Sequence, residues 1–373
     1  MTATGQELIF ALPSKERLHD EAVDFLRQCG FKIRKNGDQR EYSAKLSGIA
    51  NVSIHYYRPG EIPARVETGD AHIGITGRDL YLESSDTADT SDALNLKSPA
   101  PKAKSHEPKA KSHILRPDLG FGDARLVVGV PQSWIDVASI EDLHEAAVLF
   151  RQKHGRSLRV ATKFMHLARA FFAGHGIVEY SLVESLGATE GAPKAGFADL
   201  IVDLTSTGAT LAQNHLKEID GGTVLNSECC LIASLHENIW SETTLDALEQ
   251  VIEQMEARMR ANGLLILRAS VPADSTARVG RALGDSYNCT FTSSRAQAQI
   301  GRRPSADLRD DMVVLCPKAS VYAAVQDLRA AGAGEVIVDR SEFVYQGRPS
   351  SIDRFKALLA HHGVGPAASR VQR

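Results

Sequence analysis

The chain has 373 residues, of which 43% are hydrophobic, and its formal net charge at pH 7 is −3. This length predicts two to three domains with substantial cores, and the near-neutral charge gives no reason to expect nucleic-acid or membrane binding. Because no apolar run is long enough to span a bilayer and the first residues lack a signal-peptide pattern, we expect a cytoplasmic protein.

The five cysteines are odd in number and form no CxxC pair. This spacing argues against a disulfide framework or a zinc site and favours a reducing compartment. We expect most of these thiols to be small buried side chains. They are Cys29, Cys229, Cys230, Cys289 and Cys316.

The first part of the chain alternates between strand and helix patterns. An apolar strand at 7–12 precedes a helix at 16–28, which Gly30 ends. Further predicted elements are strands at 42–46, 52–57 and 72–76 and a helix at 62–68. This alternation predicts an α/β layer built on a mixed sheet.

Apolar periodicity stops between Ser84 and Pro117. The sequence Pro101-Lys-Ala-Lys-Ser-His106 is repeated at 108–113. A segment of this composition buries too little apolar surface to offset its ordering entropy, so it predicts a disordered insertion. We expect its lysines and histidines to be solvated rather than to bind a phosphate or a metal.

A second α/β unit with its own sheet is predicted after the insertion. Its elements are strands at 125–130, 158–161, 180–183 and 198–202 and helices at 140–154 and 164–174. A strand at 228–235 and one long amphipathic helix at 243–261, ending at Gly263, follow.

The remaining elements follow a β-α-β-β-α-β order, which is typical of a ferredoxin-like, ligand-sensing domain. Its predicted strands are 264–271, 288–293, 311–316 and 335–339, with a helix at 318–331. A final helix at 352–360 precedes a tail that we expect to fray.

The clearest candidate site is the loop that follows the 198–202 strand and leads into a predicted helix at 209–216. Backbone N–H groups, hydroxyls and a glycine at the start of a helix are suited to bind a phosphate. The acidic residue before the loop suits two ribose hydroxyls or a metal bound to them. An ordinary hydroxyl-rich turn is the alternative. The loop comprises Asp203, Thr205, Ser206, Thr207, Gly208, Ala209, Thr210 and Leu211.

Charged residues also follow three strands of the first unit. Lys15 and Arg17 follow the first strand, Arg58 follows 52–57, and Asp79 follows 72–76. Two α/β lobes form a cleft at the carboxyl ends of their strands, so the cations could neutralise a polyphosphate there. Asp79 or Glu190 could hold magnesium or a sugar hydroxyl. The alternative is that each is a solvated loop charge.

Several motifs together resemble the ATP phosphoribosyltransferase family in its long form. In chain order they are Pro13-Ser-Lys-Glu-Arg-Leu18, Arg58-Pro-Gly-Glu-Ile-Pro63, Gly74-Ile-Thr-Gly-Arg-Asp-Leu80, Leu119-Gly-Phe-Gly122, the segment 198–211 and Leu216-Lys-Glu218. The resemblance runs from about residue 8 to 346. Val313-Val-Leu-Cys-Pro-Lys318 and Leu328-Arg-Ala-Ala-Gly-Ala333 are similar to the family's C-terminal regulatory domain.

This resemblance implies a reaction in which N1 of ATP displaces pyrophosphate from C1 of phosphoribosyl pyrophosphate (PRPP), with Mg²⁺, in the first step of histidine biosynthesis. It implies a two-lobed, periplasmic-binding-protein-like catalytic core, an ACT-like regulatory domain, inhibition by L-histidine and a homohexamer. The expected division is 1–122 with 233–262 for lobe I, 123–232 for lobe II, 263–348 for the regulatory domain and 349–373 for a C-terminal helix and tail.

The resemblance also implies roles for residues. The 203–211 loop binds the PRPP 5-phosphate, with Asp203 on the ribose hydroxyls, and Glu190 contacts adenine or a metal. The expected catalytic residues are Lys15, Arg17, Arg58, Asp79, Glu190 and Asp203. The nucleotide is expected to contact Lys15, Arg17, Arg58, Thr76, Gly77, Asp79 and Thr162. Asp79, Glu190 and Asp203 are expected metal ligands, and Asn288 and Thr290 are expected histidine contacts.

The chain also departs from the family pattern. Ser14-Lys15-Glu16 replaces a common Asn-Lys-Gly, and His72 replaces an acidic residue, which we expect to affect only packing. The insertion is longer than usual, and Asn288-Cys-Thr-Phe-Thr292 only loosely resembles the histidine-binding turn. Two other functions stay open: a two-lobed binding protein without catalysis, and a non-catalytic assembly subunit.

Overall fold

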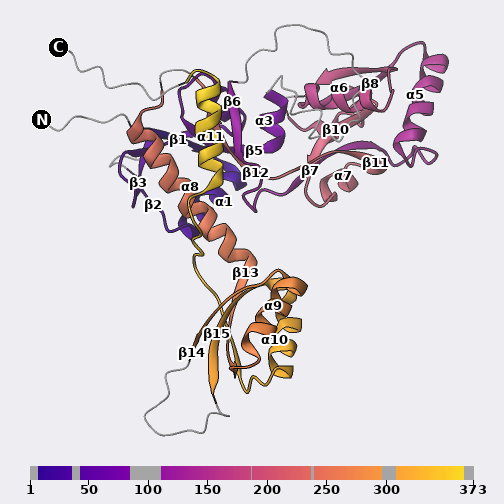
Figure 1. The fold of residues 1–373 in the computed structure, drawn as a ribbon. Helices are drawn as coiled ribbons and strands as arrows, with labels where there is room; N and C mark the ends of the chain where they lie inside the picture. The colour runs from indigo at the N-terminus through magenta and orange to yellow at the C-terminus, as the bar shows by residue number, and fades with distance from the viewer. Residues whose placement is uncertain are drawn as a thin grey trace, which may run out of the picture. The chain divides into compact units, whose positions relative to one another are not determined.

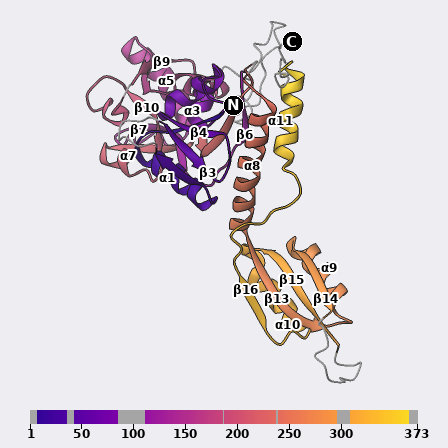
Figure 2. The ribbon, with the colours of Figure 1, turned by 90° about the vertical axis from the view of Figure 1, so that its left-hand side faces the viewer.

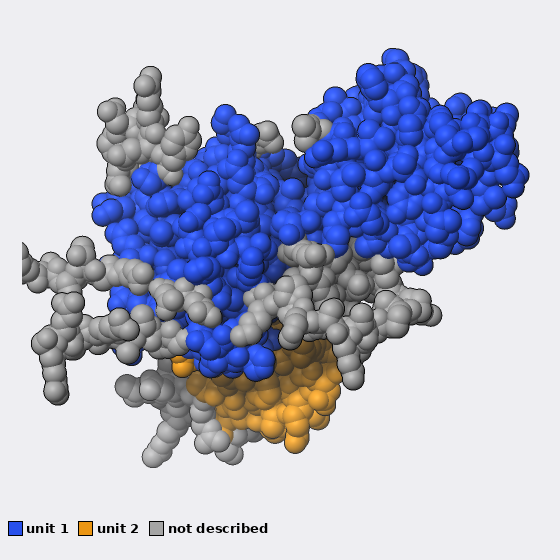
Figure 3. Space-filling view, turned by 90° about the horizontal axis from the view of Figure 1, so that it is seen from above, with its two compact units in different colours: residues 1–27, 31–248, 350–373 blue, residues 28–30, 249–349 orange. Residues whose placement is uncertain are grey.

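The computed structural model describes residues 7–35, 43–84, 111–185, 187–236, 239–295 and 308–364. The chain divides into two compact units, coloured blue and orange in Figure 3. Unit 1 comprises residues 1–27, 31–248 and 350–373, and unit 2 comprises residues 28–30 and 249–349.

The first sheet of unit 1 has seven strands in the order β2-β3-β4-β1-β5-β12-β6. They are Lys32–Lys35 (β2), Ser43–Ser47 (β3), Val52–Tyr57 (β4), Leu8–Pro13 (β1), Ile73–Gly77 (β5), Cys229–Ser234 (β12) and Ser112–Arg116 (β6). Strand β1 runs parallel to β4 and β5, whereas β12 is antiparallel to β5 and β6. The predicted mixed sheet is confirmed, and the carboxyl ends of β1, β4 and β5 lie at one edge of it.

Helices follow these three parallel strands. They are α1 (Glu16–Gln28), the 3₁₀ turn η1 (Pro59–Glu61) with α2 (Ile62–Glu67), and α3 (Arg78–Ser84). Helix α1 buries Ala22, Phe25 and Leu26, whose spacing places them on one face of the helix.

The second sheet of unit 1 has five strands in the order β11-β7-β10-β8-β9. They are Leu216–Ser227 (β11), Ala124–Pro131 (β7), Leu200–Thr205 (β10), Leu158–Thr162 (β8) and Tyr180–Glu184 (β9). Its helices are α5 (Ile140–His154), α6 (Met165–Gly174) and α7 (Ala209–Gln213), with a 3₁₀ turn η2 (Thr189–Gly191). Helix α5 begins with a capping box between Ser139 and Asp142 and ends at Gly155 in the left-handed conformation.

The two sheets form two lobes, joined by two passages of the chain (Figure 1). The first passage leads from β6 to β7, and the second leads from β11 to β12. The passages are hydrogen-bonded to each other: Leu119 N–H donates to Cys229 O at 3.0 Å, and Cys229 N–H donates to Phe121 O at 3.0 Å. The predicted two-lobed α/β core is therefore confirmed.

The structure differs from the sequence interpretation in three segments. Strand β6 lies inside the predicted disordered insertion; residues 85–110 of that insertion lie outside the described residues, as does the tail 365–373. The predicted helix 209–216 ends at Gln213, because Leu216 begins β11. Strand β11 was not predicted, since Gly221 and Gly222 interrupt its apolar pattern and it contains register shifts.

Unit 2 contains the predicted β-α-β-β-α-β order. Its elements are β13 (Leu264–Pro272), α9 (Thr276–Tyr287), β14 (Thr290–Arg295), β15 (Arg309–Pro317), α10 (Val321–Ala330) and β16 (Val336–Asp339). The sheet order is β14-β15-β13-β16, with antiparallel pairs, which confirms the ferredoxin-like arrangement. Its core includes Leu267, Leu283 and Val314, and a Cβ on Gly280 would overlap the Phe291 ring.

The chain returns to unit 1 after unit 2. Helix α8 (Glu242–Gly263) leaves unit 1, and α11 (Ser350–His361) belongs to unit 1 again. The Phe355 ring of α11 packs edge-on against Trp240, with ring centroids 5.3 Å apart, and α11 lies beside the first turns of α8 (Figure 2). Unit 2 is therefore an insertion within unit 1.

All five cysteines are buried, as predicted. Among the described helices, none has the length and apolarity needed to cross a membrane.

His72 joins three parts of the first lobe. Its Nδ1 accepts the Ile9 N–H at 3.0 Å, so Nε2 carries the proton and donates to Ile239 O at 2.9 Å. Its ring also packs edge-on against Trp240, at 5.2 Å between centroids. Burial lowers the pKa of His72 below its usual value.

We expect His72 to make the protein less stable in mild acid. A depressed histidine pKa means that the unfolded chain binds the proton first, so stability is lost as the pH falls below about 6.5. The difference in unfolding free energy between the natural protein and His72→Gln should shrink by about 1 kcal/mol from pH 7.5 to 5.5. Urea titrations at both values measure it, with the exposed His361→Gln as control. If the difference in unfolding free energy between the natural protein and His72→Gln is the same at both pH values, the pKa of His72 is not lowered by folding.

Candidate active site

The carboxyl ends of β1, β4 and β5 place charged side chains at one edge of the first sheet. Lys15 and Arg17 follow β1, Arg58 follows β4, and Asp79 lies in the first turn of α3, just after β5. The predicted grouping at this edge agrees with the parallel register of the three strands.

A cavity of about 750 Å³ lies between the two lobes. The first lobe contributes Arg17, Arg58, Gly77 and Asp79 among others, the first passage contributes 122–124, and the second lobe contributes Lys163, Leu204, Thr205 and Ser206. Arg17 Nη1 lies 3.4 Å from Ser206 Oγ, so the two lobes meet at this wall. The cavity thus joins the predicted cations of one lobe to the predicted phosphate loop of the other.

Asp79 is a buried carboxylate in the wall of this cavity, with 5% of its surface exposed. The Ser227 hydroxyl donates to Asp79 Oδ1 at 2.6 Å, and the Asp79 N–H donates to Ser227 Oγ at 3.0 Å. Burial raises the pKa of Asp79, while the Ser227 hydroxyl and the charge of Lys163 lower it. Gly77 provides space for this carboxylate, because a Cβ there would lie 2.5 Å from Asp79 Oδ1.

The predicted phosphate loop makes a tight turn after β10. Gly208 adopts the left-handed conformation, with φ of 75°, and its N–H donates to Thr205 Oγ1 at 2.8 Å. The Glu218 carboxylate lies against Gly208 and forms a double ion pair with Arg125, at 2.7 and 2.9 Å. A glycine is needed at this turn because an L side chain rarely adopts such a conformation.

Asp203 stands at the end of β10, directly before the loop. Its Oδ1 accepts the Leu204 N–H at 2.9 Å. Burial raises the pKa of Asp203 and Glu190 raises it further, whereas the Leu204 N–H, Lys163 and the Thr189 hydroxyl lower it. Asp203 and Glu190 are therefore electrostatic neighbours, although neither lines the cavity.

Lys163 is a site residue that the sequence analysis missed. It lies between β8 and α6, lines the cavity, and interacts electrostatically with Asp79 of one lobe and Asp203 of the other. The sequence did contain a signal for Lys163, because it is a basic residue close after a predicted strand, next to Thr162. Arg58 was predicted from the same pattern.

Several predicted contacts have other roles in the structure. Thr76 and Thr162 are fully buried, which leaves no surface for a nucleotide. Thr76 Oγ1 donates to Pro59 O at 3.0 Å and so supports the turn after Arg58, and Thr162 Oγ1 accepts the Phe164 N–H at 2.9 Å. Leu211 packs into the core of the second lobe, and Lys15 is exposed at the sheet edge without lining the cavity.

The predicted metal ligands are not gathered in one cluster. Within the described ranges, no group of three or more His, Cys, Asp or Glu side chains is placed to hold a metal ion. Asp203 and Glu190 are electrostatic neighbours, and Oδ1 of Asp79 accepts the Ser227 hydroxyl. One or two carboxylates with substrate oxygens are the usual ligands of Mg²⁺.

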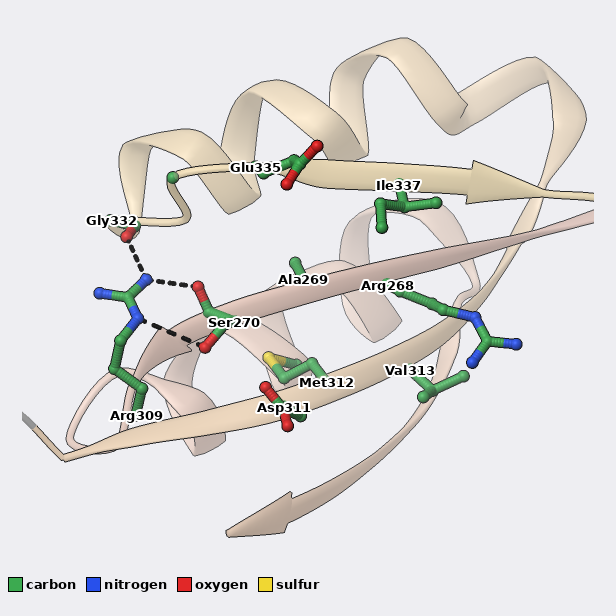
Figure 4. Close-up of a pocket in the computed structure, with 11 residues that line it drawn as sticks. Arg268, Ala269, Ser270, Arg309, Asp311, Met312, Val313, Gly332, Glu335 and Ile337 are labelled. Atoms are coloured by element: carbon green, nitrogen blue, oxygen red, sulfur yellow. Dashed lines mark hydrogen bonds between the residues drawn. The ribbon is translucent and has the colours of Figure 1, made fainter. Parts of the chain in front are cut away.

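Unit 2 has a separate cavity of about 550 Å³ on its sheet, formed by β13, β15 and the residues before and within β16 (Figure 4). Val313 and Ile337, which lie opposite Arg268 on neighbouring strands, supply the apolar surface, and Arg268, Asp311 and Glu335 carry charges of both signs around it. Asn288 and Thr290 do not line this cavity; Asn288 ends α9 in the left-handed conformation, and Thr290 begins β14.

Comparison with known proteins identifies relatives over nearly the whole chain. Residues 58–260 match the family model described as ATP phosphoribosyltransferase. The ATP phosphoribosyltransferase of Caulobacter vibrioides is 38% identical over 352 residues, which cover 94% of this chain and 98% of that protein. The protein of the same name from a Bradyrhizobium species is 37% identical, with the same coverage. A solved chain of the ATP phosphoribosyl transferase (HisG:HisZ) complex from Thermotoga maritima is 21% identical, covers 67% of this chain and 98% of its own, and aligns with a TM-score of 0.43.

We expect Gly77→Ala to displace the Asp79 carboxylate. Neither Gly77 nor Gly60 has a positive φ, but a Cβ on Gly77 meets Asp79 Oδ1, whereas a Cβ on Gly60, in the wall of the same cavity, meets no atom within 4 Å. Gly77→Ala should lower the unfolding free energy by about 1–3 kcal/mol, as overpacking usually does, and Gly60→Ala should leave it nearly unchanged. Urea unfolding of both variants measures this. Equal effects would show that the space at Gly77 is not limiting.

Proposed function

The chain belongs to the ATP phosphoribosyltransferase family, and from that premise we propose that PRPP and ATP meet in the cavity between its lobes. The enzyme transfers the phosphoribosyl group of PRPP to ATP, which is the first step of histidine biosynthesis. The observation that carries the proposed location is the cavity itself, because it joins Arg17 and Arg58 to the turn at Thr205 and Ser206.

The loop after β10 binds the 5-phosphate of PRPP. Its hydroxyls and its turn at Gly208 supply donors for a phosphate. Asp203, at the start of the loop, accepts hydrogen bonds from the two ribose hydroxyls. Thr205 and Ser206 support this assignment because they lie in the wall of the cavity.

The cations of the cavity stabilise the leaving group. Adenine N1 forms a bond to C1 of the ribose, and the C1–O bond breaks with its electron pair leaving on pyrophosphate. Arg17, Arg58 and Lys163 neutralise the charge that develops on pyrophosphate. The carboxylates of Asp79 and Asp203 favour the positive charge on the ribose ring. Positioning of two anionic substrates supplies much of the rate, since N1 needs no activation by a base.

Magnesium enters as part of the substrate in this proposal. The described residues contain no group of three or more His, Cys, Asp or Glu side chains placed for a metal, whereas pyrophosphate and ribose oxygens are ligands that Mg²⁺ prefers. Lys15, Glu190 and residues 207–210 are proposed to contact the substrates outside the cavity wall, whereas Leu211 anchors the loop in the core of the second lobe. The cytoplasm is the proposed compartment and a homohexamer the proposed assembly.

Unit 2 is proposed to sense L-histidine. Its cavity combines an apolar surface with charges of both signs, which suits a zwitterionic amino acid with a ring (Figure 4). Asn288 and Thr290 mark the alternative location, at the end of α9. A binding or assembly function without catalysis is the alternative for the whole chain, and product formation from ATP and PRPP distinguishes it.

Asp203→Ala should weaken PRPP binding while the fold survives. The side chain interacts with the Leu204 N–H and the Thr189 hydroxyl, both within the second lobe. The ribose contact is therefore the main functional loss, and we expect KM for PRPP to rise about tenfold or more. A coupled ultraviolet assay with ATP, PRPP, Mg²⁺ and pyrophosphatase measures it. The control is Asp136→Ala, at an exposed carboxylate of the same lobe. An unchanged KM in Asp203→Ala would remove the loop from its assigned role.

L-histidine should raise the melting temperature and suppress activity in the same assay. A ligand at 100 times its Kd stabilises by about 2.7 kcal/mol, which corresponds to a shift of several degrees. Asp311→Asn should abolish the shift, and Thr290→Val should preserve it. If Thr290→Val abolishes the shift and Asp311→Asn preserves it, histidine binds at the end of α9. If millimolar L-histidine does not shift the melting temperature of the natural protein, unit 2 does not sense histidine.

A further inference from the structure

Helix α6 begins without a cap from its own sequence. Phe164 occupies the N-cap position and makes no side-chain capping bond. The N–H groups of His166 and Leu167, at the second and third helical positions, donate instead to Glu83, at 2.9 Å to Oε1 and 3.0 Å to Oε2. These are the N–H groups that an N-cap side chain normally accepts, so Glu83 supplies the missing cap.

Glu83 reaches α6 from the other lobe. It lies in the last turn of α3, and Asp79 lies four residues earlier in the first turn, so both carboxylates share one face of this short helix. Helices α3 and α6 are in contact across the lobes (Figure 1). Burial raises the pKa of Glu83, while the two N–H groups lower it. A carboxylate is favoured at this position by the helix dipole as well as by the two bonds.

The capped turn lies directly after Lys163. The Phe164 N–H is held by Thr162 at 2.9 Å, and the next N–H groups along the turn are held by Glu83. The backbone on either side of the lysine is therefore fixed from both lobes. Lys163 lines the cavity, and its ammonium lies over the Phe164 ring, 4.8 Å from the ring centroid. Since a ring face does not neutralise the charge, the ammonium can still bind an anion in the cavity.

We propose that Glu83 is a positioning residue, which caps α6 across the lobes and thereby directs Lys163 at the pyrophosphate group of PRPP. This inference rests on the proposed function, since it assigns PRPP to the cavity. A lysine stem has four rotatable carbons and loses much entropy when it binds a phosphate. Fixing its backbone removes the main-chain part of the ordering cost and holds the start of the lysine stem at the cavity wall.

A double-mutant cycle tests the proposal. Glu83→Ala, Lys163→Met and the double variant are compared with the natural protein for KM for PRPP and kcat, and for binding of Mg²⁺-pyrophosphate by calorimetry. Each single variant should raise KM for PRPP and the Kd of pyrophosphate about tenfold, as the loss of one charge-assisted contact does. The double variant should be no worse than either single variant, because both remove the same contact.

The capping box of α5 provides the structural control. Ser139→Ala removes a helix cap from the same lobe, at a helix that does not line the cavity, so it should lower the melting temperature and leave KM for PRPP unchanged. Glu83→Gln keeps one acceptor oxygen and should have an intermediate KM, which makes the test independent of whether Glu83→Ala folds.

Two results would overturn the proposal. Additive effects of about a hundredfold in the double variant would mean that Glu83 acts on another part of the site. A melting-temperature loss in Glu83→Ala and Glu83→Gln with unchanged KM, as in Ser139→Ala, would mean a purely structural cap. Absence of product in the natural protein itself would instead refute the proposed function.

Discussion

The two chain passages between the lobes determine where the site can form. Leu119, Phe121 and Cys229 pair the passages through backbone hydrogen bonds, in the manner of a short stretch of sheet. Glu228 alone connects β11 to β12, which lies beside β5, and the pairing holds the first passage against this short connection. The carboxyl ends of the first lobe's parallel strands are thereby brought opposite the end of β10. Without these hydrogen bonds between the two passages, the distance between the cations of one lobe and the loop of the other would not be fixed.

The carboxylates near the cavity are more deeply buried than its cationic side chains. Asp79 is buried and Asp203 is half-buried, and both have raised pKa values, whereas Arg17, Arg58 and Lys163 are exposed at the cavity. Buried carboxylates keep one geometry, while exposed cations can follow a polyphosphate as it enters and leaves. The positive charge of Lys163 lowers the pKa of both carboxylates, against the effect of their burial. The buried carboxylates therefore keep the geometry of the site fixed, and the exposed cations can adjust to the substrate.

The sequence was informative wherever function depends on the ends of strands. Arg58, Asp79 and Thr205 could be predicted because strand periodicity locates those ends, and parallel strands align them. Thr76 and Thr162 were misjudged because a threonine at a strand end looks like a ligand contact, and only the structure shows its hydroxyl bound to backbone. Glu83 gave no signal, since its role depends on a helix more than 80 positions away. Strand β6 could not be predicted from the sequence because its partner β12 follows more than 100 residues later.

The placement of α11 affects how the polypeptide is made. Unit 1 is interrupted at Leu248 and resumes at Ser350, where Phe355 covers Trp240. On the ribosome, the catalytic lobes emerge first but leave Trp240 without its cover until unit 2 has been synthesised, about 5–20 s later at usual elongation rates. During that interval the nascent lobes expose an apolar surface to chaperones, and unit 2 can fold before they are complete. A truncation before Ser350 would make that transient exposure permanent.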